Sequence, residues 1–168
     1  YISGYPSGIV DRGSVIDPSA FSQDFLQRII IPPHAMIDNV AEINGNTLTV
    51  SVCLDFLLPV NGTWRMACTL VEDSVTGTGP QYYQANSYSG GGSGPLVDVD
   101  GTDWANLPSN VPDNQMIYRH VARAISPSFL GDPLAYSSYS NGDSENLTFT
   151  FNLDPSWDLS QLKIVSML

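Results

Sequence analysis

Residues 47–58, TLTVSVCLDFLL, decide the fold class, because hydrophobic and polar side chains alternate from Thr47 to Phe56. The hydrophobic side chains fall on every second position: Leu48, Val50, Val52, Leu54, Phe56 and Leu58. Successive side chains of a β-strand point to opposite faces of the sheet. The alternation therefore predicts a strand with one buried face and one wet face.

Further strands are expected on both sides of this stretch. Residues 35–43 form the first, and Asn44-Gly45 is a strong signal for a hairpin turn into residues 47–58. After a second turn near residue 61, residues 64–72 are expected to return as the hairpin partner of 47–58. The pattern predicts that these segments pair as antiparallel hairpins.

The C-terminal part of the chain repeats the alternating pattern. Residues 147–153 alternate hydrophobic residues with Thr and Asn, and residues 162–168 form a closing strand. Residues 116–125 fit either a strand or a helix, and we assign them as a strand. The prediction is a mainly β chain, an antiparallel two-sheet sandwich of the immunoglobulin-like or jelly-roll kind.

Two other segments define the domain organisation. Residues 1–31 are a lead-in with a short strand and a helix at 19–31, which Ser19 caps and Pro32-Pro33 end. Residues 32–168 form the sandwich domain, with a long irregular loop at 74–114. The chain begins and ends within apolar patterns, so we expect it to be part of a longer protein.

The charge balance excludes two classes of partner. The chain has 17 acidic and 6 basic residues, a net charge of −11, and a single lysine, Lys163. Such a field repels phosphate backbones and anionic headgroups, so we expect no nucleic-acid partner. No apolar run approaches the ~20 residues that span a bilayer, so direct membrane insertion is not expected.

Few residues are available for catalysis. His34 and His120 are the only histidines, and no Gly-x-Ser-x-Gly, His-Glu-x-x-His or Cys-x-x-Cys motif is present. A histidine in a strand is more often a hydrogen-bonded structural residue than a general base. We therefore expect that these residues do not form an enzyme.

The two cysteines flank the expected hairpin. A turn near residue 60 would set Cys53 and Cys68 opposite each other, within reach of a disulfide that suits an oxidising compartment. The alternative is two free thiols in a shifted register. We predict the disulfide.

The long loop holds the candidate binding residues. Asp98, Asp100 and Asp103, with Gly101 for a turn, have a spacing that can converge on calcium, or they form a solvated acidic turn. The aromatic residues nearby offer a possible ligand face, or they pack within the loop. These aromatic residues are Tyr82, Tyr83, Tyr88 and Trp104.

Several segments form a series in a fixed order along the chain. They are Gly4-Tyr5-Pro6-Ser7-Gly8-Ile9-Val10-Asp11-Arg12, the strand 66–73 ending in Glu72-Asp73, Gly79-Pro80-Gln81, residues 117–123, Gly131, and Leu162-Lys163-Ile164-Val165. This series resembles the outer membrane protein 28-related family of Bacteroidetes. Of the family's histidine-rich stretch only His120 is present, preceded by Tyr118 and Arg119.

The resemblance implies an exported, outer-membrane-associated or extracellular protein. It implies that residues 1–31 are the tail of a thioredoxin-like domain, followed by a C-terminal β-sandwich without established catalytic chemistry. A Cys-x-x-Cys of that domain would lie upstream of these residues. Redox activity is therefore not expected of this segment.

Three functions follow from these observations. The first is a non-catalytic cell-surface or extracellular binding or adhesion module, assisted by calcium. The second is a structural subunit of an extracellular filament or surface assembly. The third is the accessory half of a thioredoxin-like oxidoreductase. The expected partners are other surface proteins, glycans or copies of the chain itself.

Overall fold

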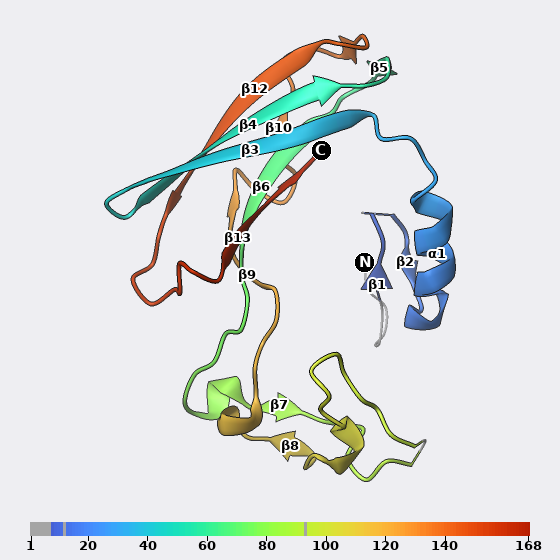
Figure 1. Cartoon of the computed structure of the whole chain (residues 1–168), viewed down its shortest axis with the longest axis vertical. Helices are drawn as coiled ribbons and strands as arrows, with labels where there is room; N and C mark the ends of the chain where they lie inside the picture. The colour runs from blue at the N-terminus through green and yellow to red at the C-terminus, as the bar shows by residue number, and fades with distance from the viewer. Residues whose placement is uncertain (1–7, 12, 93) are drawn as a thin grey trace.

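The computed structural model describes residues 8–11, 13–92 and 94–168 and shows an antiparallel β-sandwich (Figure 1). The first sheet has the strand order β12-β4-β3, with the bounds Ser144–Asn152, Thr47–Phe56 and Ala35–Asn44. In the second sheet β6 (Arg65–Glu72) is central. Its neighbours are β13 (Leu162–Met167) on one side and β9 (Val121–Ser126) with β10 (Asp132–Pro133) on the other. The prediction of a mainly β sandwich is confirmed.

Short elements complete the fold. The minor strand pairs are β1 (Gly8–Ile9) with β2 (Val15–Ile16), β5 (Val60–Asn61) with β11 (Ser138–Tyr139), and β7 (Gln84–Ala85) with β8 (Asn110–Val111). The helices are α1 (Phe21–Arg28) and the 3-10 turns η1 (Pro18–Ala20), η2 (Pro80–Tyr82), η3 (Trp104–Asn106) and η4 (Asp113–Gln115). No helix in the described part of the chain is long and apolar enough to cross a membrane.

The core lies between the two main sheets and follows the alternation of β4. The buried side chains of β4 are Leu48, Val50, Val52, Leu54 and Phe56. They pack in one cluster with Met66, Cys68 and Leu70 of β6 and with Phe149 and Phe151 of β12. Burial of one such side chain contributes about 1.5–3 kcal/mol, so this cluster is the main source of the sandwich's stability.

The hairpin predicted at Asn44-Gly45 is confirmed. Asn44 of β3 pairs with Thr47 of β4, and Gly45 takes a positive φ of 60°. A glycine adopts that angle without steric cost, which fits the tight turn. The strands predicted at 64–72, 147–153 and 162–168 are also present as β6, β12 and β13.

The predicted hairpin between residues 47–58 and 64–72 is wrong. β4 pairs with β3 and β12, whereas β6 belongs to the second sheet. After β4 the chain passes Pro59, which has no N–H for a ladder, and enters β5, which pairs with β11. This connection carries the chain from one sheet to the other.

The change of sheet also corrects the prediction of a disulfide. Cys68 is buried on the core face of β6, whereas Cys53 lies on the other face of β4, out of phase with its buried residues. Both cysteines are free thiols. Burial raises the pKa of each thiol, with Asp55 and Asp38 adding to the shift at Cys53.

The lead-in stands beside the sandwich in Figure 1. The predicted helix is shorter than expected, because α1 ends at Arg28. Asp17, not Ser19, caps the turn that precedes it: its Oδ1 accepts the Ser19 amide at 2.9 Å, and Pro18 takes the first position. Of the motif predicted at Gly4–Arg12, residues 4–7 and 12 lie outside the described residues. The assignment of 1–31 to a thioredoxin-like domain stays a prediction.

Candidate functional site

Residues 73–120 leave the sandwich between two neighbouring strands, and we call them the projecting unit. β6 ends at Glu72 and β9 begins at Val121, and these two residues pair directly. The strand predicted at 116–125 therefore begins only at residue 121. The unit carries β7, β8 and three 3-10 turns, and it lies below the sandwich in Figure 1. Because β6 and β9 pair directly with each other, the unit is an insertion between two neighbouring strands and takes no part in their sheet.

A short neck joins the projecting unit to the sandwich. Val75 and Tyr118 form an isolated antiparallel bridge with two backbone hydrogen bonds of 2.9 Å. The Tyr118 hydroxyl also donates to the carbonyl oxygen of Tyr82 at 3.0 Å. The two chain segments of the neck thus stay together where they leave the sheet.

One buried amide, Asn86, fixes the interior of the projecting unit. Its side chain, in a residue only 5% exposed, donates to the carbonyl oxygens of Trp104, Leu107 and Pro108 at 2.8, 3.4 and 3.3 Å. Its Oδ1 accepts the Tyr88 amide at 3.0 Å. Buried polar groups with several partners specify one backbone arrangement. The unit therefore has a defined conformation despite its lack of long strands.

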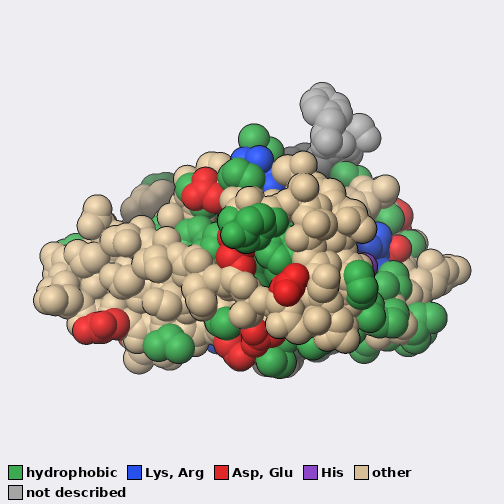
Figure 2. Space-filling view, turned by 90° about the horizontal axis from the view of Figure 1, so that it is seen from above, with side chains coloured by type: hydrophobic (Ala, Val, Ile, Leu, Met, Phe, Trp, Pro, Cys, Tyr) green, Lys and Arg blue, Asp and Glu red, His purple; other side chains and the backbone are tan. Residues whose placement is uncertain are grey.

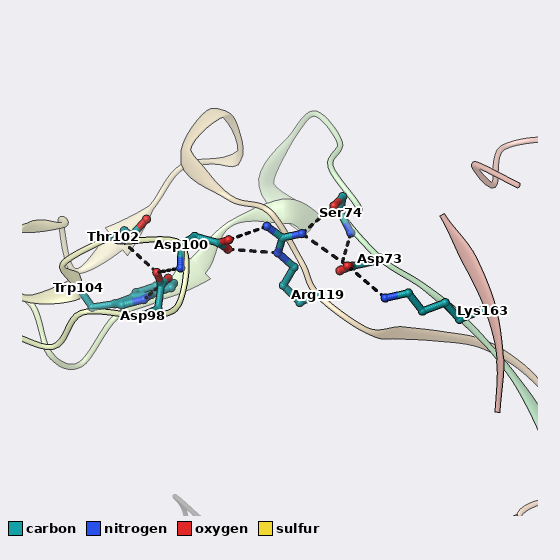
Figure 3. Close-up of polar contacts among 8 residues, drawn as sticks. All are labelled: Asp73, Ser74, Asp98, Asp100, Thr102, Trp104, Arg119 and Lys163. Atoms are coloured by element: carbon teal, nitrogen blue, oxygen red, sulfur yellow. Dashed lines mark hydrogen bonds and ion pairs between the residues drawn. The ribbon is translucent and has the colours of Figure 1, made fainter. Parts of the chain in front are cut away.

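The carboxylate of Asp98 organises the acidic turn (Figure 3). Oδ1 accepts the amides of Asp100 and Thr102 at 2.9 and 3.0 Å, and Oδ2 accepts the Trp104 indole N–H at 3.0 Å. Burial alone would raise the pKa of Asp98, but the hydrogen bonds from Thr102 and Trp104 outweigh it and hold that pKa below its ordinary value. Asp98 thus acts as a turn-forming residue.

Asp103 has a similar local role. It caps η3 by accepting the Ala105 amide at 3.0 Å, and the same oxygen accepts the Leu96 amide at 3.0 Å. Its second oxygen accepts the Asn106 side-chain amide at 2.9 Å. Both oxygens of this carboxylate are engaged within the loop.

Arg119 connects the acidic turn to the neck (Figure 3). Its guanidinium makes a bidentate contact with Asp100, Nη2 to Oδ1 at 2.8 Å and Nε to Oδ2 at 3.2 Å. Nη1 donates to the Ser74 hydroxyl at 2.8 Å and lies 3.6 Å from Asp73 Oδ2. Lys163 of β13 lies 3.6 Å from the same Asp73 oxygen. The Ser74 amide and these two cations hold the pKa of Asp73 below its ordinary value.

The structure does not bring the predicted calcium ligands together. Asp100 binds Arg119, whereas Asp98 and Asp103 bind separate sets of loop amides. In the described ranges no group of three His, Cys, Asp or Glu side chains is placed to hold a metal ion. Calcium binding here stays a prediction, and this arrangement does not favour it.

The predicted aromatic face is also divided. Tyr82 is half-buried and packs against the ring of Tyr118, with centroids 6.5 Å apart. Trp104 is tied to Asp98, and Tyr88 is half-buried. Of the four predicted aromatic residues only Tyr83 is exposed. Three of the four therefore pack within the unit.

Other residues of the unit also carry exposed apolar side chains. Leu96, Val97 and Val99 surround the acidic turn, and Val99 is 99% exposed. Val97 forms a bridge with Asp103, which keeps this segment extended against the turn. The signal in the sequence was the pair of valines around Asp98, in a region otherwise rich in Gly, Ser and Asp. Apolar side chains left exposed on a fixed loop are typical of contact surfaces.

No known family, curated protein or solved structure matches this chain. The function is therefore inferred from the geometry.

The two histidines show no catalytic pairing. The His34 ring packs on Trp64 with centroids 5.5 Å apart, and His120 has a positive φ of 52° at the neck. Within the part of the chain that the structure describes, neither ring is hydrogen-bonded to a serine, cysteine or carboxylate side chain. That the chain has no catalytic activity stays a prediction.

Proposed function

We propose that this chain is a non-catalytic binding or adhesion module of a cell-surface or extracellular protein. The sandwich is the scaffold, and the projecting unit presents the contact surface. One observation carries this proposal. A unit of defined conformation is inserted between two strands that pair directly with each other. Loops held on a rigid scaffold are where binding residues are most often found.

The chemistry of the contact surface favours a protein partner with a basic rim. Val97 and Val99 provide an apolar centre, and the chain as a whole carries a net charge of −11. Apolar centres with charged rims are the usual anatomy of protein interfaces. The opposite charge on the partner would speed association and fix its orientation.

A binding assay with a matched control tests the proposal. We expect the purified chain to bind at least one of a panel of immobilised extracellular matrix proteins (laminin, fibronectin, collagen). The double variant Val97→Ser/Val99→Ser should weaken that binding about tenfold, because central apolar contacts dominate interfaces. The matched control is Val40→Ser, at an exposed valine on β3.

Two outcomes would contradict the assignment of Val97 and Val99 to the contact surface. One is equal binding by the wild type and the double variant. The other is equal weakening by the double variant and by Val40→Ser, which would indicate a general effect of surface polarity.

A specific observation also supports the alternative of a structural subunit. An apolar cavity of about 160 Å³ lies between the edge strands β3 and β13. Its lining residues are Ala41, Ile43, Leu48, Leu70, Leu153, Leu159, Leu162 and Ile164. An apolar gap between edge strands suits the addition of a strand from another copy. A strictly monomeric species by light scattering at all concentrations would remove this alternative.

The lead-in supports the alternative of an accessory half of a thioredoxin-like oxidoreductase. No described residue of β1, β2 or α1 is buried, and Phe25, Leu26 and Ile30 are exposed. Such an apolar surface is expected to pack on other protein. We also propose membership in the outer membrane protein 28-related family, from the sequence motifs alone. The gene sequence upstream of Tyr1 tests both.

A further inference from the structure

A pocket of about 350 Å³ opens where β5, β11 and the start of β12 meet. Its lining residues are Tyr136, Ser138, Tyr139, Asp143 and Ser144. The strands β5 and β12 meet at the top of Figure 1, whereas the projecting unit lies at the bottom. Figure 2 looks onto this end of the molecule, where acidic and hydrophobic side chains lie together near the middle of the face. The volume is within the range of about 300–1,000 Å³ that is usual for small-molecule sites.

The floor of the pocket is rigid. Tyr139, only 6% exposed, stacks on the ring of Phe56 with centroids 4.1 Å apart and an interplanar angle of 11°. Its hydroxyl donates to Glu145 and accepts the Tyr136 amide at 3.1 Å. The other oxygen of Glu145 accepts the Ala135 amide at 3.0 Å. These bonds fix the ring of Tyr139 and the backbone of Tyr136 relative to the sheet.

The turn that forms one wall is held against β4. The amide of Phe56 donates to the carbonyl oxygen of Asp143 at 2.9 Å, and the Gly142 amide donates to the carbonyl oxygen of Phe56 at 2.8 Å. Gly142 has a φ of 90°, which a residue with a side chain rarely adopts. The wall and the floor are thus parts of one hydrogen-bonded frame.

The walls leave several polar groups open to a ligand. Asp143 Oδ2 accepts the Ser140 amide at 2.7 Å, and its Oδ1 has no hydrogen bond within the described part of the chain. The hydroxyls of Ser138, Ser144 and Tyr136 likewise have no partner among the described residues. The Tyr136 ring meets Tyr139 edge-on, at 76° and 5.9 Å, and stays exposed. The pocket therefore offers hydroxyls, one carboxylate oxygen and one aromatic ring.

This set of groups selects among ligand classes. The carboxylates of Asp143 and Glu145 repel anions, and the hydroxyl-rich walls do not suit a purely apolar ligand. A quaternary ammonium ligand is usually held by an aromatic cage, but Phe56 covers one face of Tyr139, and Glu145 is already engaged. A neutral sugar matches the groups, because its hydroxyls donate and accept and its C–H face packs on an aromatic ring.

We propose that this pocket binds one unit of a neutral saccharide, with Tyr136 as the platform and Asp143, Ser138 and Ser144 as hydrogen-bonding groups. The site is independent of the projecting unit and of the function proposed for it. It adds a glycan contact to the opposite end of the module.

Saturation-transfer NMR and calorimetry with neutral disaccharides (cellobiose, maltose, lactose and chitobiose) test the proposal. We expect at least one of them to bind. The variant Tyr136→Ala should weaken binding about fivefold to tenfold, whereas Tyr136→Phe keeps the ring and most of the affinity. Asp143→Ala should also weaken it. The matched control is Tyr83→Ala, at an exposed tyrosine of the projecting unit, which should bind as the wild type does.

Three results would overturn the proposal. The first is no binding of any disaccharide at millimolar concentration. The second is binding that Tyr136→Ala and Asp143→Ala leave unchanged while their melting temperatures match the wild type. The third is tighter binding of choline, the cationic probe, at the same residues, which would assign the pocket to cations.

Discussion

Replacing Phe56 with alanine is expected to lower the free energy of unfolding by about 3–5 kcal/mol. Phe56 is 1% exposed at the end of β4, and its ring stacks on Tyr139. The substitution removes the buried ring, leaves a cavity in a packed core and deprives Tyr139 of its stacking partner. Urea denaturation with linear extrapolation measures the change.

The matched control for this experiment is Val40→Ala on β3. Val40 is exposed, so its truncation should change the free energy of unfolding by less than about 0.5 kcal/mol. A loss at Phe56 no larger than the loss at Val40 would mean that the two sheets do not pack through this part of β4.

Replacing Arg123 with methionine is expected to cost about 3 kcal/mol of stability. Arg123 Nε lies 2.7 Å from Glu72 Oε2, and Glu72 is 4% exposed. The other carboxylate oxygen accepts the Asp158 amide at 3.1 Å. Without the guanidinium, a charged carboxylate stays buried with only one donor, and its lost hydration is no longer compensated. Chemical denaturation of the variant measures this loss.

A double-mutant cycle separates the ion pair from simple loss of packing. The double variant Arg123→Met/Glu72→Gln should lose less free energy of unfolding than the two single variants lose together, because no unpaired charge remains in it. Lys163→Met serves as a control, since the Lys163 side chain is 56% exposed and its 3.6 Å contact with Asp73 contributes about 0–1 kcal/mol. Additive losses at Arg123 and Glu72 would contradict the pairing.

The period-two pattern of residues 47–58 was sufficient to predict the central strand and its buried face. The Asn44-Gly45 signal was sufficient for the hairpin to β3, because both strands are close in sequence. The pairing of β4 with β12 joins residues far apart in the chain, and no local pattern contains that information. The expected pairing of β4 with β6 failed for this reason, and the predicted disulfide failed with it.

The sequence predicted which segment holds the candidate site but not how the residues of that segment interact. The loop, its carboxylates and its aromatic residues were found from composition, but Asp98 and Asp103 bind loop amides and Trp104 binds Asp98. Short loop-forming carboxylates and metal ligands have similar spacings, so the sequence does not distinguish them. The pair of Glu72 and Arg123 was missed because the two residues lie on different strands.

The saccharide pocket left a signal in the sequence that was not used. The run from Tyr136 to Ser144 alternates tyrosines with Ser, Asn, Gly and Asp, a composition common in adaptable binding surfaces. Its place in the fold depends on the stacking of Tyr139 on Phe56, which joins a loop to a distant strand. The pocket therefore becomes visible only when both elements are in place.

Excision of the projecting unit tests the central claim, that the sandwich is a scaffold and the unit is the contact surface. Residues 76–117 are replaced by an Asn-Gly turn that joins Val75 to Tyr118, which already form a backbone bridge. The account predicts that this variant keeps cooperative unfolding and a β-type circular dichroism spectrum but loses binding to the matrix protein that the wild type binds. A variant that does not fold, or that binds that protein as the wild type does, would contradict the account.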